Sequence, residues 1–179
     1  SVLTASNAAA PVKDPGLLRH VPPEVRVHRA MTLEPPFYLR KKVWSILEAV
    51  NGHKPVRPSV NPTGTEREPG GKSTGGVTGT LRRMLMPDPQ VLWKPLALRA
   101  ASRIIERERI DAVMVTAPPF SVFLIGNELK RRYPNIKLIS DFRDEWLRFY
   151  LTDFDFLNDS QTRRRAERIE RETIELSDL

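Results

Sequence analysis

The chain has 179 residues, no cysteine and a formal net charge of +7 at neutral pH. This length suits one domain with a sizeable core, and the lack of cysteine excludes disulfides and thiolate chemistry. No apolar run approaches the roughly 20 residues of a membrane span, and no secretory signal is visible. We therefore expect a cytoplasmic protein. Its charge favours an anionic partner, such as phosphate groups, an acidic lipid surface or nucleic acid, although a merely basic soluble domain explains it equally well.

The first thirty residues contain two candidate strands with a short helical segment between them. Residues 1–6 resemble the end of a strand whose beginning is missing, so we expect the natural chain to extend further N-terminal. Residues 14–20 suit one or two helical turns. Residues 24–29 alternate with period two, which is typical of a partly exposed strand.

Two stretches of unusual composition follow. Residues 35–50 form a candidate amphipathic helix with aromatic and basic side chains, which suits either an anionic membrane surface or packing on its own domain. Residues 51–80 hold seven of the nine glycines and almost no large apolar side chain, so we expect a flexible insert there. Residues 70–74, GGKST, are not a P-loop, because Glu66 stands where the motif needs glycine and no strand precedes it.

From residue 92 onward the pattern predicts helix, strand, helix, strand and helix. The first helix spans residues 92–108, and its buried face comprises Trp93, Leu96, Ala100, Ile104 and Ala101. The short apolar run at 112–115 predicts a strand buried on both faces of a parallel sheet. A helix follows the Pro118–Pro119 pair, with one apolar face made of Val122, Ile125, Gly126, Leu129 and Tyr133.

The second strand of this unit is predicted at residues 136–139, and a polar helix at 160–175. Arg164 with Glu167 and Arg168 with Glu172 are spaced to support that helix as ion pairs.

The strand–helix–strand unit brings two polar loops together. Such a unit forms a right-handed parallel crossover in nearly all cases, so both strands end at the same edge of the sheet. Residues 116–121 and 140–144 should therefore lie side by side, where open α/β sheets bind their ligands. This argument places hydroxyls, two carboxylates, a guanidinium and a helix N-terminus in one crevice.

Three separated stretches resemble one family. Residues 86–89 (MPDP) with Trp93, residues 116–121 (TAPPFS) and residues 141–146 (DFRDEW) resemble the N-terminal domain of bacterial family-4-like (group 1) glycosyltransferases. The resemblance covers residues 81–179 well and residues 1–29 loosely. It implies a Rossmann-like α/β fold, a three-layer parallel sheet that forms the N-terminal half of a GT-B architecture.

The resemblance also implies an activity and its partners. In enzymes of this type the N-terminal half holds a sugar or lipid-linked acceptor, and the C-terminal half holds a nucleoside-diphosphate sugar as donor. The sugar moves with retention of configuration and without a required metal or cofactor, in polysaccharide biosynthesis at the cytoplasmic side of the membrane. The first glycine-rich strand loop and the donor domain of the family are not found in this sequence. We therefore expect a truncated, inactive piece of an enzyme, with a possible anionic membrane surface as a further partner.

Five residues are candidates for the acceptor site. Asp141 suits binding or deprotonation of an acceptor hydroxyl, and capping of a following helix is an equal alternative. Arg143 suits a phosphate or an ion pair with Asp141 or Asp144, and Asp144 itself fits a structural role better. Thr116 and Ser121 suit an anion near the helix start, although capping is the simpler role for Ser121.

Two other functions remain as alternatives, and two candidate metal-binding patterns are rejected. A nucleotide-sugar epimerase would share the two-domain fold, and a basic α/β module could bind nucleic acid without catalysis, although no nucleic-acid motif is present. Asp153-Phe154-Asp155 resembles the metal-binding DxD of another fold and is discounted. The histidines His20, His28 and His53 lie in unrelated segments, so no metal site is predicted.

Overall fold

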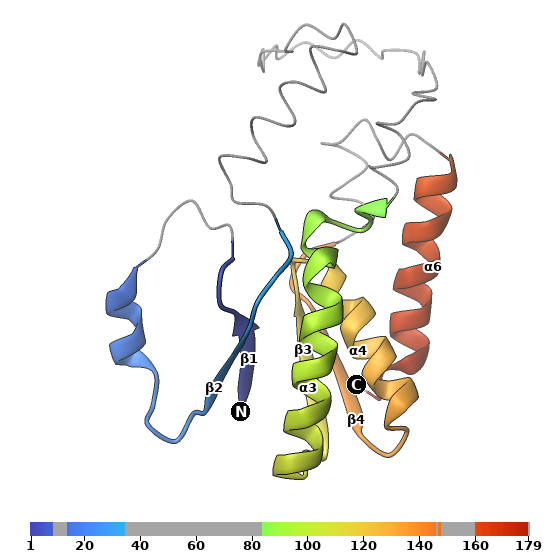
Figure 1. Ribbon diagram of the computed structural model, residues 1–179. Helices are drawn as coiled ribbons and strands as arrows, with labels where there is room; N and C mark the ends of the chain where they lie inside the picture. Colours follow the sequence, from blue (N-terminus) through green and yellow to red (C-terminus); the bar gives the residue numbers. More distant parts are fainter. Residues whose placement is uncertain (9–13, 35–83, 146, 148–159, 179) are drawn as a thin grey trace, which may run out of the picture.

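The structure is a computed structural model that describes residues 1–8, 14–34, 84–145, 147 and 160–178 (Figure 1). The candidate amphipathic helix at 35–50 and the glycine-rich insert at 51–80 lie outside these residues. The elements in chain order are β1 (Val2–Ala5), η1 (Pro15–His20), β2 (Val27–Ala30), η2 (Pro89–Trp93), α3 (Lys94–Glu108), β3 (Ala112–Ala117), α4 (Ser121–Arg132), β4 (Lys137–Phe142) and α6 (Ser160–Leu176).

The described strands form two small parallel sheets. β1 pairs with β2, with Val2 opposite Val27, and β3 pairs with β4, with Ala112 opposite Lys137. Both pairs are parallel because a helical segment carries the chain back between the two strands. The fold is therefore mixed α/β, as predicted, and the strand–helix–strand unit is confirmed.

The three long helices lie side by side in the order α3, α4, α6, with β3 and β4 behind them and β1 and β2 to the left of α3 (Figure 1). α4 is the central element because it contacts α3, α6, β3 and β4. Two core clusters result. One joins α4 and α6 to β3 and β4 through Met86, Val115, Ala117, Phe120, Phe123, Leu138, Ala166 and Ile169. The other joins α3 to α4 through Ala97, Leu98, Ile105, Ile125, Leu129 and Ile136.

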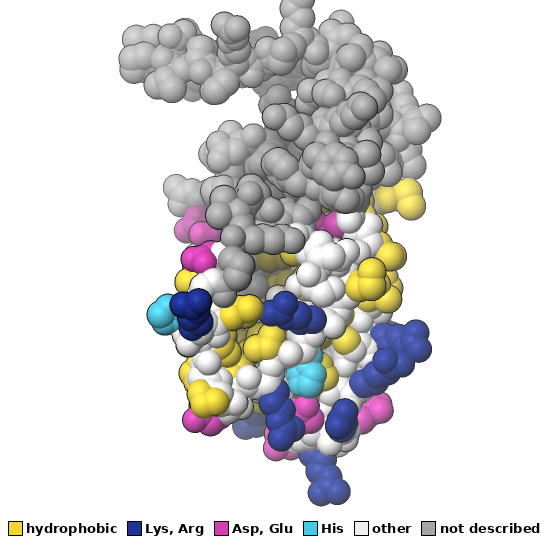
Figure 2. All heavy atoms as spheres, turned by 60° about the vertical axis from the view of Figure 1, so that its left-hand side comes forward, with side chains coloured by type: hydrophobic (Ala, Val, Ile, Leu, Met, Phe, Trp, Pro, Cys, Tyr) yellow, Lys and Arg dark blue, Asp and Glu magenta, His cyan; other side chains and the backbone are white. Residues whose placement is uncertain are grey.

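Strand β3 is buried on one face and not on both, contrary to the prediction. Val115 and Ala117 point into the core, whereas Met114, the residue before Val115, is 61% exposed. The reason is that the three long helices α3, α4 and α6 pack on one face of the strands. On the open side, η1 and the exposed face of β1 and β2 enclose an apolar hollow of about 760 Å³. Figure 2 brings this side forward and shows apolar side chains between scattered basic ones.

The buried face of α3 is also rotated from the predicted one. Ala97, Leu98 and Ile105 are buried, whereas the predicted positions such as Leu96 and Ile104 are only half-buried. The helix is sandwiched between α4 and the β1–β2 pair. Because α3 contacts α4 on one side and β1 and β2 on the other, more of its circumference is covered than the single apolar face that periodicity predicts.

Helix α6 follows the predicted bounds, but its ion pairs differ. Arg163 pairs with Glu167 within the helix at 2.9 Å, and Glu172 pairs with Arg131 of α4. The predicted ion pairs, Arg164 with Glu167 and Arg168 with Glu172, do not form. Packing of α6 against α4 explains the exchange, because it turns Glu172 toward the neighbouring helix.

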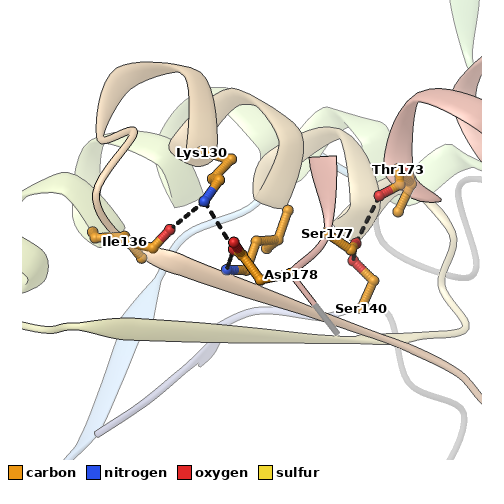
Figure 3. Close-up of polar contacts among 7 residues, drawn as sticks. Lys130, Ile136, Ser140, Thr173, Ser177 and Asp178 are labelled. Carbon is orange, nitrogen blue, oxygen red and sulfur yellow. Dashed lines mark hydrogen bonds and ion pairs between the residues drawn. The ribbon is translucent and has the colours of Figure 1, made fainter. Parts of the chain in front are cut away.

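The end of α6 is fixed to β4 by polar contacts (Figure 3). The Asp178 backbone N–H donates to the Leu138 carbonyl at 2.8 Å, and its carboxylate accepts from the Leu138 N–H at 2.7 Å and from Lys130 Nζ at 2.8 Å. The Ser177 hydroxyl donates to the Thr173 carbonyl at 2.6 Å, and its oxygen shares a hydrogen bond with Ser140 Oγ at 2.7 Å. The hydrogen bonds that the Asp178 carboxylate accepts from Lys130 and from the Leu138 N–H hold its pKa below the usual range, the one from Lys130 contributing most. Together these contacts join the C-terminal end of α6 to β4.

Gly126 allows α4 to lie close to the β3–β4 sheet. A Cβ at this position would stand 3.1 Å from Leu138 Cδ1 and 3.1 Å from both γ-methyls of Val115. Alanine gains about 1 kcal/mol of helix propensity, but overpacking costs about 1–3 kcal/mol, and β-branched Val115 cannot turn both methyls away.

We expect Gly126→Ala to lower the free energy of unfolding by up to about 2 kcal/mol in urea denaturation, the overpacking cost less the gain in helix propensity. An increase in stability would show that α4 can move away from the sheet at little cost. Ala100→Gly, at a half-buried position of α3, is the control for helix propensity alone.

Candidate functional site at the ends of β3 and β4

The two strands bring their predicted site residues into one row. Both strands run further than the sequence indicates, to Ala117 and Phe142, because their backbones stay paired to the end. Thr116 is therefore directly opposite Asp141, and both are strand residues. Since side chains in register on adjacent parallel strands share a face, these two project from the same side of the sheet.

The segments after the strands also meet. The Arg143 backbone N–H donates to the Ala117 carbonyl at 3.1 Å, which extends the pairing by one residue. Asp141 is half-buried, and the side chains of Thr116, Arg143 and Asp144 are exposed. Four of the five predicted residues thus lie at one edge, where a ligand can reach them.

Two of the alternative roles are not supported here. Asp141 lies inside β4, so it does not stand at the start of a helix. Within the described residues, Arg143 makes no ion pair with Asp141 or Asp144. The carboxylate of Asp141 and the guanidinium of Arg143 are therefore not tied to each other.

Ser121 is placed differently from the other candidates. Its side chain is buried, and its backbone N–H donates to the Asp88 carboxylate, Oδ2, at 2.9 Å. Asp88 directly precedes η2 and lies 33 positions earlier in the chain. The carboxylate thus occupies the positive end of the α4 dipole, where a bound anion would otherwise lie.

Asp88 is a residue that sequence reasoning missed as a site component. Its side chain is 8% exposed, and its second oxygen, Oδ1, accepts no hydrogen bond within the described part of the chain. Burial raises the pKa of Asp88, and hydrogen bonds from Ser121 oppose this rise. The available signal was its position in the MPDP stretch, where a carboxylate stands between two prolines.

Asp88 should be important for stability, with a distinctive pH dependence. Removing the carboxylate in Asp88→Ala leaves the start of α4 without a partner, and we expect a loss of about 1–3 kcal/mol in unfolding free energy. Asp88→Asn, which keeps an acceptor oxygen, should lose less. Exposed Asp144→Ala is the control, with an expected change within about 0.5 kcal/mol.

Because the folded-state pKa of Asp88 is raised, its stabilising contribution is full below the ordinary value of 3.8 and is lost as pH rises through the folded-state pKa. Urea unfolding from neutral pH downward should therefore show wild type gaining stability relative to Asp88→Asn. A gap that closes as pH falls would show that the folded state prefers the ionised carboxylate.

Three phenylalanine rings pack together between α4 and the segments that carry the site residues. Phe123 of α4 is fully buried, with its ring centroid 4.3 Å from that of Phe142 and 6.2 Å from that of Phe120. Phe142 is the last residue of β4, and Phe120 precedes α4. The cluster therefore joins both site segments to the helix. Cis peptide bonds occur in the same region, at Met86–Pro87, Ala117–Pro118 and Pro118–Pro119.

Metal binding finds no support in the part of the chain that the structure describes. No group of three His, Asp or Glu side chains comes together there. His28 pairs with Glu108 at 3.0 Å, near the start of β1. His53 and the Asp153-Phe154-Asp155 stretch lie outside the described residues. Trp93 has a structural contact, since its indole N–H donates to the Ala30 carbonyl at 3.3 Å.

Comparison with protein-family models, with curated proteins and with solved structures gave no match. None of the described helices has both the length and the apolar character of a membrane span.

Proposed function

We propose that this chain is the acceptor-binding domain of a nucleotide-sugar-dependent glycosyltransferase. One observation carries the proposal: the three stretches that resemble group 1 glycosyltransferases converge at one place. Asp88 of the first binds the N–H of Ser121 in the second, and Arg143 of the third binds the carbonyl of Ala117 in the second. Residues separated by more than fifty positions thus build one structure.

The chemistry of the edge fits a carbohydrate acceptor. Thr116 and Asp141 offer a hydroxyl and a carboxylate in register, and carboxylates that accept from sugar hydroxyls can also help to deprotonate them. Arg143 and Asp144 add an exposed guanidinium and carboxylate nearby. In this proposal Asp141 orients the attacking hydroxyl, and Arg143 binds a phosphate of a lipid-linked acceptor or of the donor.

The proposal extends to the finer fold and to the missing partner. The two parallel pairs would belong to one Rossmann-like three-layer sheet, the N-terminal half of a GT-B enzyme. The donor, a nucleoside-diphosphate sugar, would bind to a C-terminal domain, and no metal or other cofactor is needed. Action on a lipid-linked acceptor would bring the protein to the cytoplasmic face of a membrane.

The test uses the natural gene product that contains these residues. It is incubated with a panel of labelled nucleoside-diphosphate sugars and a cell extract of the same organism, which supplies the natural acceptor. Label transferred to a polymer or lipid supports the proposal. Conversion of the donor sugar to its epimer without acceptor would favour an epimerase, and absence of both reactions would overturn the enzymatic assignment.

A further inference from the structure

A second candidate binding site lies between α3 and α4, which run side by side (Figure 1). It is a groove of about 600 Å³ that follows α3 for most of its length. Its lining residues are Lys94, Pro95, Leu98, Arg99, Ser102, Arg103 and Glu106 of α3 with Glu128 and Arg132 of α4. None of these residues belongs to the segments that follow β3 and β4.

The charges in the groove are unbalanced. Four cations line the groove against two carboxylates. Glu128 pairs with Arg132 at 3.0 Å, and Glu106 accepts from the neutral Tyr133 hydroxyl at 2.6 Å and keeps its charge. By contrast, Arg99 and Arg103 make no ion pair with any described carboxylate. The groove therefore presents positive charge that the described side chains do not neutralise.

The spacing of Arg99 and Arg103 indicates which chemical groups the groove can bind. Arg99 and Arg103 are four residues apart on one helix, so their Cα atoms are separated by about 6 Å along the axis and both side chains leave the same face. Guanidinium groups bind phosphate oxygens in a bidentate manner. Lys94, one to two turns earlier, adds a third cation at the same groove.

A neutral donor lies between the two arginines. The Ser102 hydroxyl is buried and has no hydrogen-bond partner among the described residues. A rotation about its χ1 angle would aim this hydroxyl into the groove, where a phosphate oxygen would satisfy it. Pro95, which is exposed, supplies apolar surface to the same groove.

We propose that the α3–α4 groove binds a soluble ligand that carries two or more phosphate groups. A concave site favours a small ligand over a bilayer, because a flat surface would meet only the rim of the groove. The inference does not rest on the proposed glycosyl transfer, since it involves other residues and its test has no turnover readout.

The test is calorimetric titration of inorganic triphosphate into the full 179-residue chain at roughly physiological ionic strength, where exposed charges are screened beyond about 8 Å. The double variant Arg99→Gln/Arg103→Gln should bind at least about tenfold more weakly than wild type. The matched control is Arg168→Gln/Arg171→Gln, which removes the same charge from exposed positions of α6 and should change the affinity less than about twofold. Circular dichroism confirms that both variants are folded.

Each other outcome overturns the inference. Equal weakening in both double variants would show attraction to net charge only. Absence of triphosphate binding to wild type would remove the site. Binding to phosphatidylglycerol vesicles without binding to triphosphate would show that the arginines meet a lipid surface instead.

Discussion

Replacing Phe123 by alanine should lower the free energy of unfolding by about 3–5 kcal/mol, the usual cost of emptying a buried aromatic site. Phe123 has no exposed surface and lies against the Phe142 ring. Since small domains are stable by only about 5–15 kcal/mol, this loss would remove a large share of the total. Urea denaturation followed by circular dichroism measures it.

Two variants make this result interpretable. Phe123→Leu keeps most of the volume and should cost less than the alanine variant. Ile174→Ala truncates a side chain of α6 that is 62% exposed and should change stability by no more than about 0.5 kcal/mol. A loss below about 1 kcal/mol for Phe123→Ala would mean that the cluster does not hold α4 to β4.

Replacing Asp141 by asparagine should reduce sugar transfer by the natural gene product about 10²- to 10⁴-fold if the carboxylate accepts the proton of the acceptor hydroxyl. The isosteric amide keeps the position in β4, opposite Thr116, and removes only the negative charge. The effect should appear in kcat at saturating acceptor, measured as release of nucleoside diphosphate.

The kinetic constants separate the two roles left open for Asp141. A raised KM with unchanged kcat would show that Asp141 binds the acceptor without taking its proton. Glu175→Gln, at an exposed position of α6 away from this edge, is the control and should change kcat/KM only slightly. Equal rates for Asp141→Asn and wild type would place the acceptor site elsewhere.

The strand–helix–strand unit could be predicted because its signals are local. The apolar run before Pro118 indicates the first strand, the helical period from Val122 to Tyr133 indicates the helix, and the run at residues 136–139 indicates the second strand. The parallel pairing then follows because a helix between two neighbouring strands forms a crossover connection. For the same reason the meeting of Thr116 with Asp141 could be anticipated, although the strands end later than their apolar runs.

The remaining features depend on contacts between distant segments. Asp88 meets Ser121 across 33 positions, and no local pattern indicates which helix a carboxylate will cap. The exposure of Met114 depends on where the helices pack. The short apolar run at residues 112–115 does not by itself show whether one face of the strand or both are covered. The pairing of Glu172 with Arg131 likewise reflects the contact between α6 and α4.

A side-by-side assay of sugar transfer is the most direct test of the proposed acceptor-binding role of this chain. The natural gene product and a polypeptide of residues 1–179 are incubated with the same labelled nucleoside-diphosphate sugars and the same cell extract. We expect the natural product to incorporate label and residues 1–179 to incorporate none, because the donor site is proposed to lie in another domain. Equal incorporation by residues 1–179 would contradict the account, since both substrates would then bind within this chain, and no incorporation by either protein would remove the proposed transferase altogether.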